Sequence, residues 1–274
     1  MLKKSLLLIT LSLTLCTDLL VTTLAVSAKP AATTRTQVKP QTSRPASKPA
    51  RRRLIGFKVP RIRGSRNLEA GAARGKCTSD TISAVSSPKT VAIEKDKVPV
   101  EITVSNRPTF FVNVPETSAT QASFLLKSED NDVLLEKTLS VSATKGILAY
   151  TLPTDYSGLE AGKKYRWRLS LLCNPNSGDR SGDANAGGWI ELKKPDQPVA
   201  KQLEATTDPI DRAAIYADYG YLQDSLKTLA DLRATNPNDP DLANNWSALF
   251  KTVYLPKLAQ QPIIQLEAIT SDTQ

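Results

Sequence analysis

One absence restricts the residue types that could do chemistry: the chain of 274 residues contains no histidine. This excludes serine–histidine–aspartate and cysteine–histidine nucleophiles, and every metal site with a histidine ligand. Asp, Glu, Lys and Tyr remain as acids and bases, but their spacing singles out no pair. We therefore expect no catalytic residue, no cofactor and no metal, and a protein that is not an enzyme.

The cysteines offer a second kind of chemistry. The chain has Cys16, Cys77 and Cys173. Cys16 lies in an apolar N-terminal run and would be lost with a cleaved signal, which leaves the other two as a pair. In an exported protein such a pair predicts a disulfide, Cys77–Cys173. Two buried free thiols are the alternative.

Residues 1–28 predict export. Two lysines precede a mostly apolar run that ends in Val26-Ser27-Ala28, which suits a signal peptidase. Asp18 and several Thr and Ser make the run weakly apolar for a permanent membrane span. We expect a cleaved signal peptide and a location in the periplasm or cell envelope. The alternatives are retention as an N-terminal membrane anchor and lipid attachment at Cys16.

A basic, Pro-rich tract over residues 29–74 predicts a disordered linker, because it has few large apolar residues to bury. Residues 29–76 hold 14 Lys or Arg against Glu69 alone, net +13, whereas residues 77–274 carry a net charge of −5. Such clusters favour an anionic envelope polymer or lipid surface, and export argues against nucleic acid as a routine partner. A solubilising spacer is the alternative. The candidate polyanion-binding residues are Arg51, Arg52, Arg53, Lys58, Arg61, Arg63 and Arg66.

Alternation of apolar and polar side chains predicts strands over residues 75–195. In Lys163–Cys173 the aromatic Tyr165 and Trp167 share one face with Leu169. Roughly six or seven such strands at about ten-residue spacing predict an antiparallel immunoglobulin-like β-sandwich. The approach to Tyr165 resembles the tyrosine corner of these sandwiches, in which a Tyr bonds back to the preceding turn.

Two aromatic residues are candidates for stacking on a ligand. Phe110, Tyr165 and Trp167 lie on the apolar faces of their strands and are expected in the core. Phe111 falls on the opposite face of its strand, and Trp189 lies beside a Gly-rich loop. We therefore regard Phe111 and Trp189 as the residues that could contact a sugar.

Residues 196–256 change to helical periodicity. Asp208-Pro209 and Asp239-Pro240 each provide an N-cap followed by a first-turn proline. The spacing over 216–237 resembles a single tetratricopeptide hairpin, which a further helix follows. Its apolar side is expected to pack on the sandwich or on that helix, with a peptide-binding groove as the alternative. Residues 257–274 are expected to be a frayed tail.

Several short motifs occur in a fixed order along roughly residues 70–256. They are Gly71-Ala72-Ala73-Arg74-Gly75-Lys76-Cys77, Arg107-Pro108-Thr109-Phe110-Phe111, Tyr165-Arg166-Trp167, Gly188-Trp189-Ile190, Arg212-Ala213-Ala214-Ile215-Tyr216-Ala217 and Leu229-Ala230-Asp231-Leu232-Arg233. With the paired cysteines, this order resembles a family of exported cyanobacterial proteins known as a domain of unknown function, number 928. The resemblance implies a cyanobacterial, extracytoplasmic origin, and it implies no activity and no site residues.

The combined prediction is an α+β protein that is non-catalytic and binds partners at the envelope. The basic tether would bind an anionic surface and the folded part a protein partner. The alternatives are a carbohydrate-binding module that uses Phe111 and Trp189, and a hydrolase that uses carboxylates.

Overall fold

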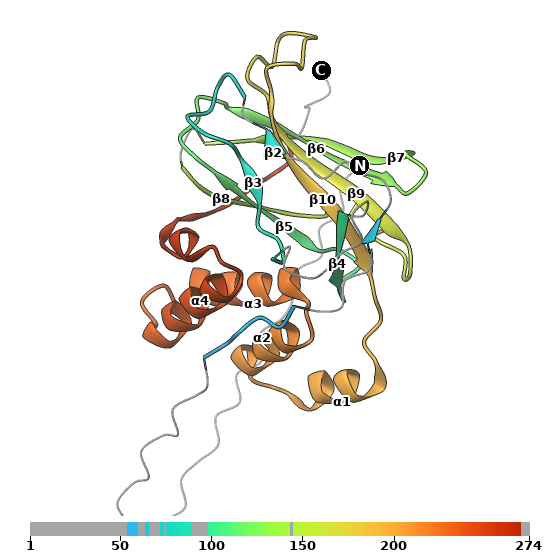
Figure 1. Ribbon diagram of the computed structural model, residues 1–274, viewed down its shortest axis with the longest axis vertical. Helices are drawn as coiled ribbons and strands as arrows, with labels where there is room; N and C mark the ends of the chain where they lie inside the picture. The colour runs from blue at the N-terminus through green and yellow to red at the C-terminus, as the bar shows by residue number, and fades with distance from the viewer. Residues whose placement is uncertain are drawn as a thin grey trace, which may run out of the picture. The chain divides into compact units, whose positions relative to one another are not determined.

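The computed structural model describes residues 54–59, 64–65, 72–73, 75–88, 98–142 and 145–269. All of them belong to one compact unit, Arg51–Gln274. The signal segment over 1–28 and most of the basic tract lie outside the described residues. The described part is an α+β fold of two β-sheets and four α-helices (Figure 1).

The larger sheet has five long strands with two short additions. Its strand order is β4-β10-β9-β6-β7, and β1 pairs with β4 while β2 pairs with β10. The bounds are β1 Gly64–Ser65, β2 Ala72–Ala73, β4 Val98–Thr103, β6 Gln121–Ser128, β7 Val133–Ser140, β9 Lys164–Leu171 and β10 Ala184–Leu192. The expected Tyr165 contact is confirmed, because the Glu160 N–H donates to the Tyr165 hydroxyl at 2.9 Å.

The smaller sheet has the order β11-β8-β5-β3. The bounds are β3 Ser83–Ala84, β5 Thr109–Val114, β8 Gly146–Thr151 and β11 Ile263–Gln265. The two sheets pack face to face around one core cluster. At its centre the ring of Phe110 lies 5.1 Å from Phe124 and 4.8 Å from Trp167, so one aromatic residue of the smaller sheet contacts two of the larger.

The helices cover the other face of the smaller sheet (Figure 1). This layer consists of α2 Pro209–Asp218, α3 Leu222–Thr235, α4 Pro240–Thr252 and the 3-10 helix η1 Pro256–Gln260, whereas α1 Gln197–Ala205 packs against the larger sheet. Both expected N-caps are confirmed: Asp208 and Asp239 each accept two backbone N–H bonds. The smaller sheet is thus a middle layer, with Phe110 facing the larger sheet and Phe111 facing the helices.

The disulfide Cys77–Cys173 forms as expected, with 5.1 Å between the Cα atoms. It joins the turn after β2 to the residues that follow β9. The Cys77 backbone N–H also donates to Cys173 Sγ at 3.1 Å.

Three expectations about the elements are wrong. The sheets are mixed rather than antiparallel, because β4 runs parallel to β10 and β11 runs parallel to β8. Helix α1 is additional to the three expected helices; it packs Val199 and Leu203 against the outer face of β4. Residues up to 269 are not frayed, because β11 extends the smaller sheet and Leu266 is buried in the core between the sheets.

The segment after β11 also covers an edge of the larger sheet. The Ser140 N–H donates to the Glu267 carbonyl, and the Ile269 N–H donates to the Thr138 carbonyl. This pairing places Ala268 opposite Leu139 of β7. The last described residues therefore link the edge of β8 to the edge of β7.

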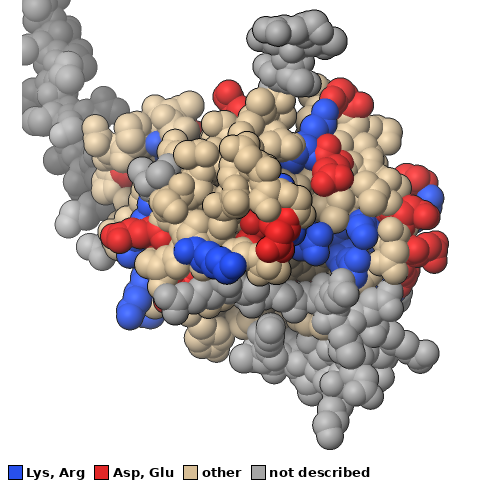
Figure 2. All heavy atoms as spheres, turned by 90° about the horizontal axis from the view of Figure 1, so that it is seen from above, with Lys and Arg blue, Asp and Glu red and all other residues tan. Residues whose placement is uncertain are grey.

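The charged surface of the described residues is mixed on the face that Figure 2 shows. Lys and Arg side chains lie among Asp and Glu side chains there. Within the described part of the chain, no helix is long and apolar enough to cross a membrane.

Candidate functional site

The most distinctive site involves the short segment Leu54–Val59, which we call the strap. The sequence places these residues in the basic tract, where a disordered linker is expected. The structure instead lays the strap across the helices in an extended conformation, with Ile55 3% and Phe57 7% exposed. Both side chains join the apolar cluster between the helices and the smaller sheet. The linker prediction is therefore wrong for these six residues.

Backbone hydrogen bonds hold the strap in place. The Ile55 N–H donates to Asn245 Oδ1 at 3.0 Å, and the Phe57 N–H donates to Thr252 Oγ1 at 2.9 Å. The Lys58 N–H donates to the Ala217 carbonyl at 3.0 Å. These bonds are made by main-chain groups of the strap, so they fit any extended segment of suitable shape.

We call the four residues that receive the strap the receiving surface: Ala217, Asp218, Asn245 and Thr252. Two of them lie at the end of α2 and two on α4. Asn245 is 3% exposed, and its amide Nδ2 donates to the Asp241 carbonyl at 2.8 Å. That bond turns the side-chain oxygen towards the strap. Thr252 is fixed in the same way, because its hydroxyl donates to the Leu249 carbonyl at 2.7 Å.

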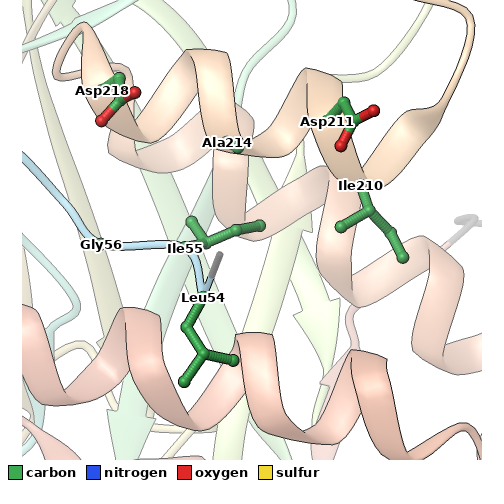
Figure 3. A pocket seen from close by; sticks show the side chains of 7 residues that line it. All are labelled: Leu54, Ile55, Gly56, Ile210, Asp211, Ala214 and Asp218. Carbon is green, nitrogen blue, oxygen red and sulfur yellow. The ribbon is translucent and has the colours of Figure 1, made fainter. Parts of the chain in front are cut away.

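A small pocket opens where the strap meets α2. It has a volume of about 150 Å³ and is lined by Leu54, Ile55, Gly56, Ile210, Asp211, Ala214 and Asp218. Figure 3 shows the strap residues beside α2, with Asp211 and Asp218 towards the two ends of the lining. The pocket therefore combines an apolar lining with carboxylates, which suits an aliphatic stem that carries a positive charge.

Lys58 is the one candidate polyanion-binding residue within the described part of the chain. Its ammonium lies 2.9 Å from the Asp218 carboxylate, and the two side chains are 60% and 37% exposed. An ion pair this exposed contributes about 0–1 kcal/mol. The six arginines of the candidate set lie outside the described residues.

The favourable and unfavourable contributions to the free energy of binding the strap to the helices nearly cancel. Burying two large apolar side chains contributes about 1.5–3 kcal/mol each, and three hydrogen bonds contribute about 0.5–1.5 kcal/mol each. Ordering six backbone residues costs about 1–2 kcal/mol each. The strap is therefore expected to leave the helices far more readily than the core unfolds.

The two candidate stacking residues are buried, so that prediction is wrong. Phe111 and Trp189 are each 1% exposed. Phe111 is covered because the helices form a third layer on its face of β5, and the pattern of the strand alone does not predict that layer. Trp189 lies between Val100 and Arg166 in the larger sheet. Neither ring can stack on a sugar without a rearrangement of the fold.

Two buried carboxylates with a raised pKa were not singled out from the sequence. Glu101 accepts bonds from the backbone N–H and the hydroxyl of Ser87, at 2.9 and 2.8 Å. Asp224 accepts from the Thr103 hydroxyl at 3.0 Å and the Val104 N–H at 3.3 Å. Burial raises the pKa of both carboxyl groups, and it raises that of Asp224 to about 6. The hydrogen bonds lower these pKa values, but the effect of burial is larger. Each carboxylate therefore joins two segments of the fold. Among the described residues, no group of side chains is arranged to bind a metal ion.

The comparisons place the chain in a family. By its fold, the described part of the chain is an α+β module of two sheets and four α-helices, and the helices bind an extended segment, the strap. The model of the Domain of Unknown Function (DUF928) matches residues 64–263, and the chain belongs to this family. A search of the curated proteins finds no match. The strap lies upstream of the matched residues.

Proposed function

We propose that this chain is a non-catalytic interaction protein that acts outside the cytoplasm, in the periplasm or cell envelope. Its basic tract binds an anionic polymer or lipid surface, and its helices bind an extended segment of a protein partner. The observation that carries the proposal is the strap, because an extended segment already occupies the helices through backbone hydrogen bonds. The disulfide supports the compartment, since such bonds persist in oxidising environments.

The proposal includes a closer description of the two structural parts. The sheets form an immunoglobulin-like sandwich with parallel edge pairings, supported by the Glu160–Tyr165 bond of a tyrosine corner. Helices α2 and α3 form a single tetratricopeptide-like hairpin, supported by their turn at Gly220, which has φ +83°. A single hairpin leaves an apolar side that another segment must cover, and the strap and α4 cover it here.

The alternatives receive less support. A carbohydrate-binding module based on Phe111 and Trp189 requires exposed rings, and both are buried. A carboxylate-dependent hydrolase requires acids that can reach a substrate. The carboxylates with raised pKa, Glu101 and Asp224, are both 8% exposed and hydrogen-bonded to neighbouring segments.

The test is binding of a strap peptide to a chain whose own strap is weakened. In the full chain, Ile55→Ala with Phe57→Ala removes both buried side chains of the strap and leaves the receiving surface intact. A labelled peptide of residues 51–60 is titrated and followed by fluorescence anisotropy. We expect saturable binding to the double variant and weaker binding to the unaltered chain, whose receiving surface is occupied.

The matched control is the same peptide with alanine at the positions of Ile55 and Phe57. It keeps every charge and loses only the apolar side chains. If the folded double variant binds both peptides equally, the attraction is electrostatic and the proposed recognition is wrong. If it binds neither peptide, the helices do not receive segments from other chains.

A further inference from the structure

We propose that the receiving surface selects its partner segment by a pattern of side chains in an extended stretch: a large apolar residue, a small residue and a second apolar residue. The first apolar side chain of the partner is larger than Ile55 and fills the pocket beside α2. The inference rests on the proposed function and deepens it, because it names the chemistry of the segment that the helices bind.

The first step is the set of main-chain contacts that an occupant must reproduce. The N–H groups of Ile55, Phe57 and Lys58 donate to α4 and to the end of α2. Proline has no N–H, so it cannot make these bonds at any of the three positions. Between the two apolar positions, a Cβ added to Gly56 would meet Thr252 Cγ2 at 3.6 Å, an ordinary van der Waals contact. Alanine therefore fits there in place of glycine.

The second step is the space that the strap leaves unfilled. The side chain of Ile55 is 3% exposed, yet a pocket of about 150 Å³ lies beside it. In Figure 3 this side chain extends towards the side of the pocket where Ile210 lies. Ile210 and Ala214 of α2 line the pocket and are only partly buried. Apolar space of about this volume can hold a molecule of benzene, so a side chain larger than isoleucine has room at this position.

The third step decides between charge and apolar surface as the source of selectivity. The carboxylates of Asp211 and Asp218 lie towards the two ends of the lining. Asp218 already pairs with Lys58, and an ion pair this exposed changes an affinity by about fivefold at most. Each methylene buried against the apolar middle of the lining tightens binding about fourfold. A side chain that adds several carbons to that of Ile55 therefore gains more from the apolar lining than from the carboxylates.

These three steps make the strap the weaker of two possible occupants. It satisfies the main-chain positions but leaves apolar surface of α2 in contact with water. A partner segment that makes the same hydrogen bonds and also covers that surface binds more tightly, and it displaces the strap for that reason. Phenylalanine at the position of Ile55 is the simplest side chain that meets this requirement.

The test compares labelled peptides of residues 51–60 in their binding to the full chain with Ile55→Ala and Phe57→Ala. Ile55→Phe in the peptide should tighten binding about fourfold or more. The matched control is Phe57→Trp in the peptide, which enlarges a side chain that is 7% exposed and not part of the pocket lining. This control should bring no gain. Equal affinities of the isoleucine and phenylalanine peptides would overturn the proposal.

Two further comparisons identify the source of the gain. Ala214→Leu in the receiving chain fills the pocket from α2 and should remove the advantage of the phenylalanine peptide, because the two changes compete for the same space. An advantage that persists would show that the pocket is not its source. Ile55→Lys in the peptide offers an aliphatic stem with a charge instead. If this peptide binds more tightly than the phenylalanine peptide, the carboxylates select the segment and the proposal is wrong.

Hydrogen exchange tests the pocket without any peptide. Ile55→Phe in the full chain should slow exchange of the Phe57 and Lys58 amides about fourfold or more, because these amides exchange when the strap leaves the helices. Amides of β9 serve as the internal reference and should not change. Exchange that is unchanged or faster would show that the pocket does not accept the larger side chain.

The two proposals fail separately. If no peptide binds but Ile55→Phe slows exchange of the strap amides, the pocket favours a larger side chain, whereas the proposed binding of another chain is wrong and the selection of a partner is wrong with it. If the isoleucine peptide binds and phenylalanine brings no gain in either measurement, the helices bind partner segments and the proposed pattern is wrong.

Discussion

At the scale of single residues, the buried acids Asp224 and Glu101 set how the fold responds to pH. Asp224 fixes the start of α3 to Thr103 and Val104 at the end of β4. Burial raises its pKa from 3.8 to about 6, and burial also raises the pKa of Glu101. Both acids favour the folded state more when they are protonated than when they are ionised.

We therefore predict that mild acidification stabilises the fold. The contribution of Asp224 is fully present below pH 3.8, its unfolded value, and is lost as the pH rises through about 6. A shift of this size corresponds to about 3 kcal/mol at most. The free energy of unfolding from urea titrations should rise as the pH is lowered from 7.5 to 5.

The control for this prediction is Asp224→Asn, which does not titrate and retains one of the two acceptor oxygens, so that it keeps the bond from either the Thr103 hydroxyl or the Val104 N–H. Its unfolding free energy should vary less between pH 5 and 7.5, with Glu101 accounting for a remaining slope of the same sign. A pH dependence identical to that of the unaltered chain would show that Asp224 is ionised without penalty in the fold.

At the scale of elements, the Cys77–Cys173 disulfide is a covalent constraint between distant parts of the chain. It joins residues 96 positions apart and fixes the start of the described sheets to the end of β9. The bond limits the unfolded chain, so its effect on stability grows with the length of the loop that it closes.

We predict that Cys77→Ser with Cys173→Ser lowers the free energy of unfolding by up to about 4–5 kcal/mol, the chain-entropy estimate for a loop of this length. The measurement is urea unfolding followed by tryptophan fluorescence. Reduction of the unaltered chain should give the same loss, because both changes open the same loop. An unchanged midpoint in both cases would contradict the prediction and show that closing this loop does not limit the unfolded chain.

Local patterns predict elements where neighbours in the sequence decide the structure. The alternation around Trp167 predicts β9, and the Asp-Pro pairs predict the starts of α2 and α4, because side chains a few residues apart determine both. The parallel pairs of β4 and β11 depend on residues far along the chain. No local signal specifies such a pairing.

The candidate site shows the same limit. Ile55, Phe57 and Val59 alternate with Gly56 and Lys58. This alternation is typical of an extended, half-buried segment. The surrounding tract is basic and has few large apolar residues, and this composition predicts a disordered linker instead. Asn245 and Thr252 are ordinary helical residues in the sequence, and they become receptors only when the strap lies beside them. The burial of Phe111 could not be predicted from local sequence, because the helical layer that covers it is distant in the chain.

At the scale of the whole molecule, opposite charges are divided between two regions. Residues 29–76 carry a net +13, whereas residues 77–274 carry −5. The net positive charge of the chain therefore comes from the tract that leads into the folded part. Attraction of that tract to an anionic surface is screened by salt over about 8–10 Å.

We predict that the full chain co-sediments with purified cell envelope at low salt and is released as the salt concentration rises. Glutamine at Arg51, Arg52, Arg53, Arg61, Arg63 and Arg66 should lower the salt concentration at which the chain is released and keep the strap sequence intact. This comparison is cleaner than truncation at Gly75, which would also remove the strap. Equal, salt-insensitive sedimentation of both proteins would assign envelope binding to the folded part.

The contact between the strap and α4 also fixes an order of events during synthesis. Ile55 and Asn245 are 190 residues apart, and Phe57 and Thr252 are 195 apart. Translation proceeds from the N-terminus, at about 5–20 residues per second, so about 10–40 s separate the synthesis of the strap from that of its receptor. During that interval the newly made chain carries Ile55 and Phe57 without the helix that buries them. A newborn chain therefore exposes two apolar side chains that the finished protein buries, and a factor that handles the chain during its synthesis can contact them in that interval.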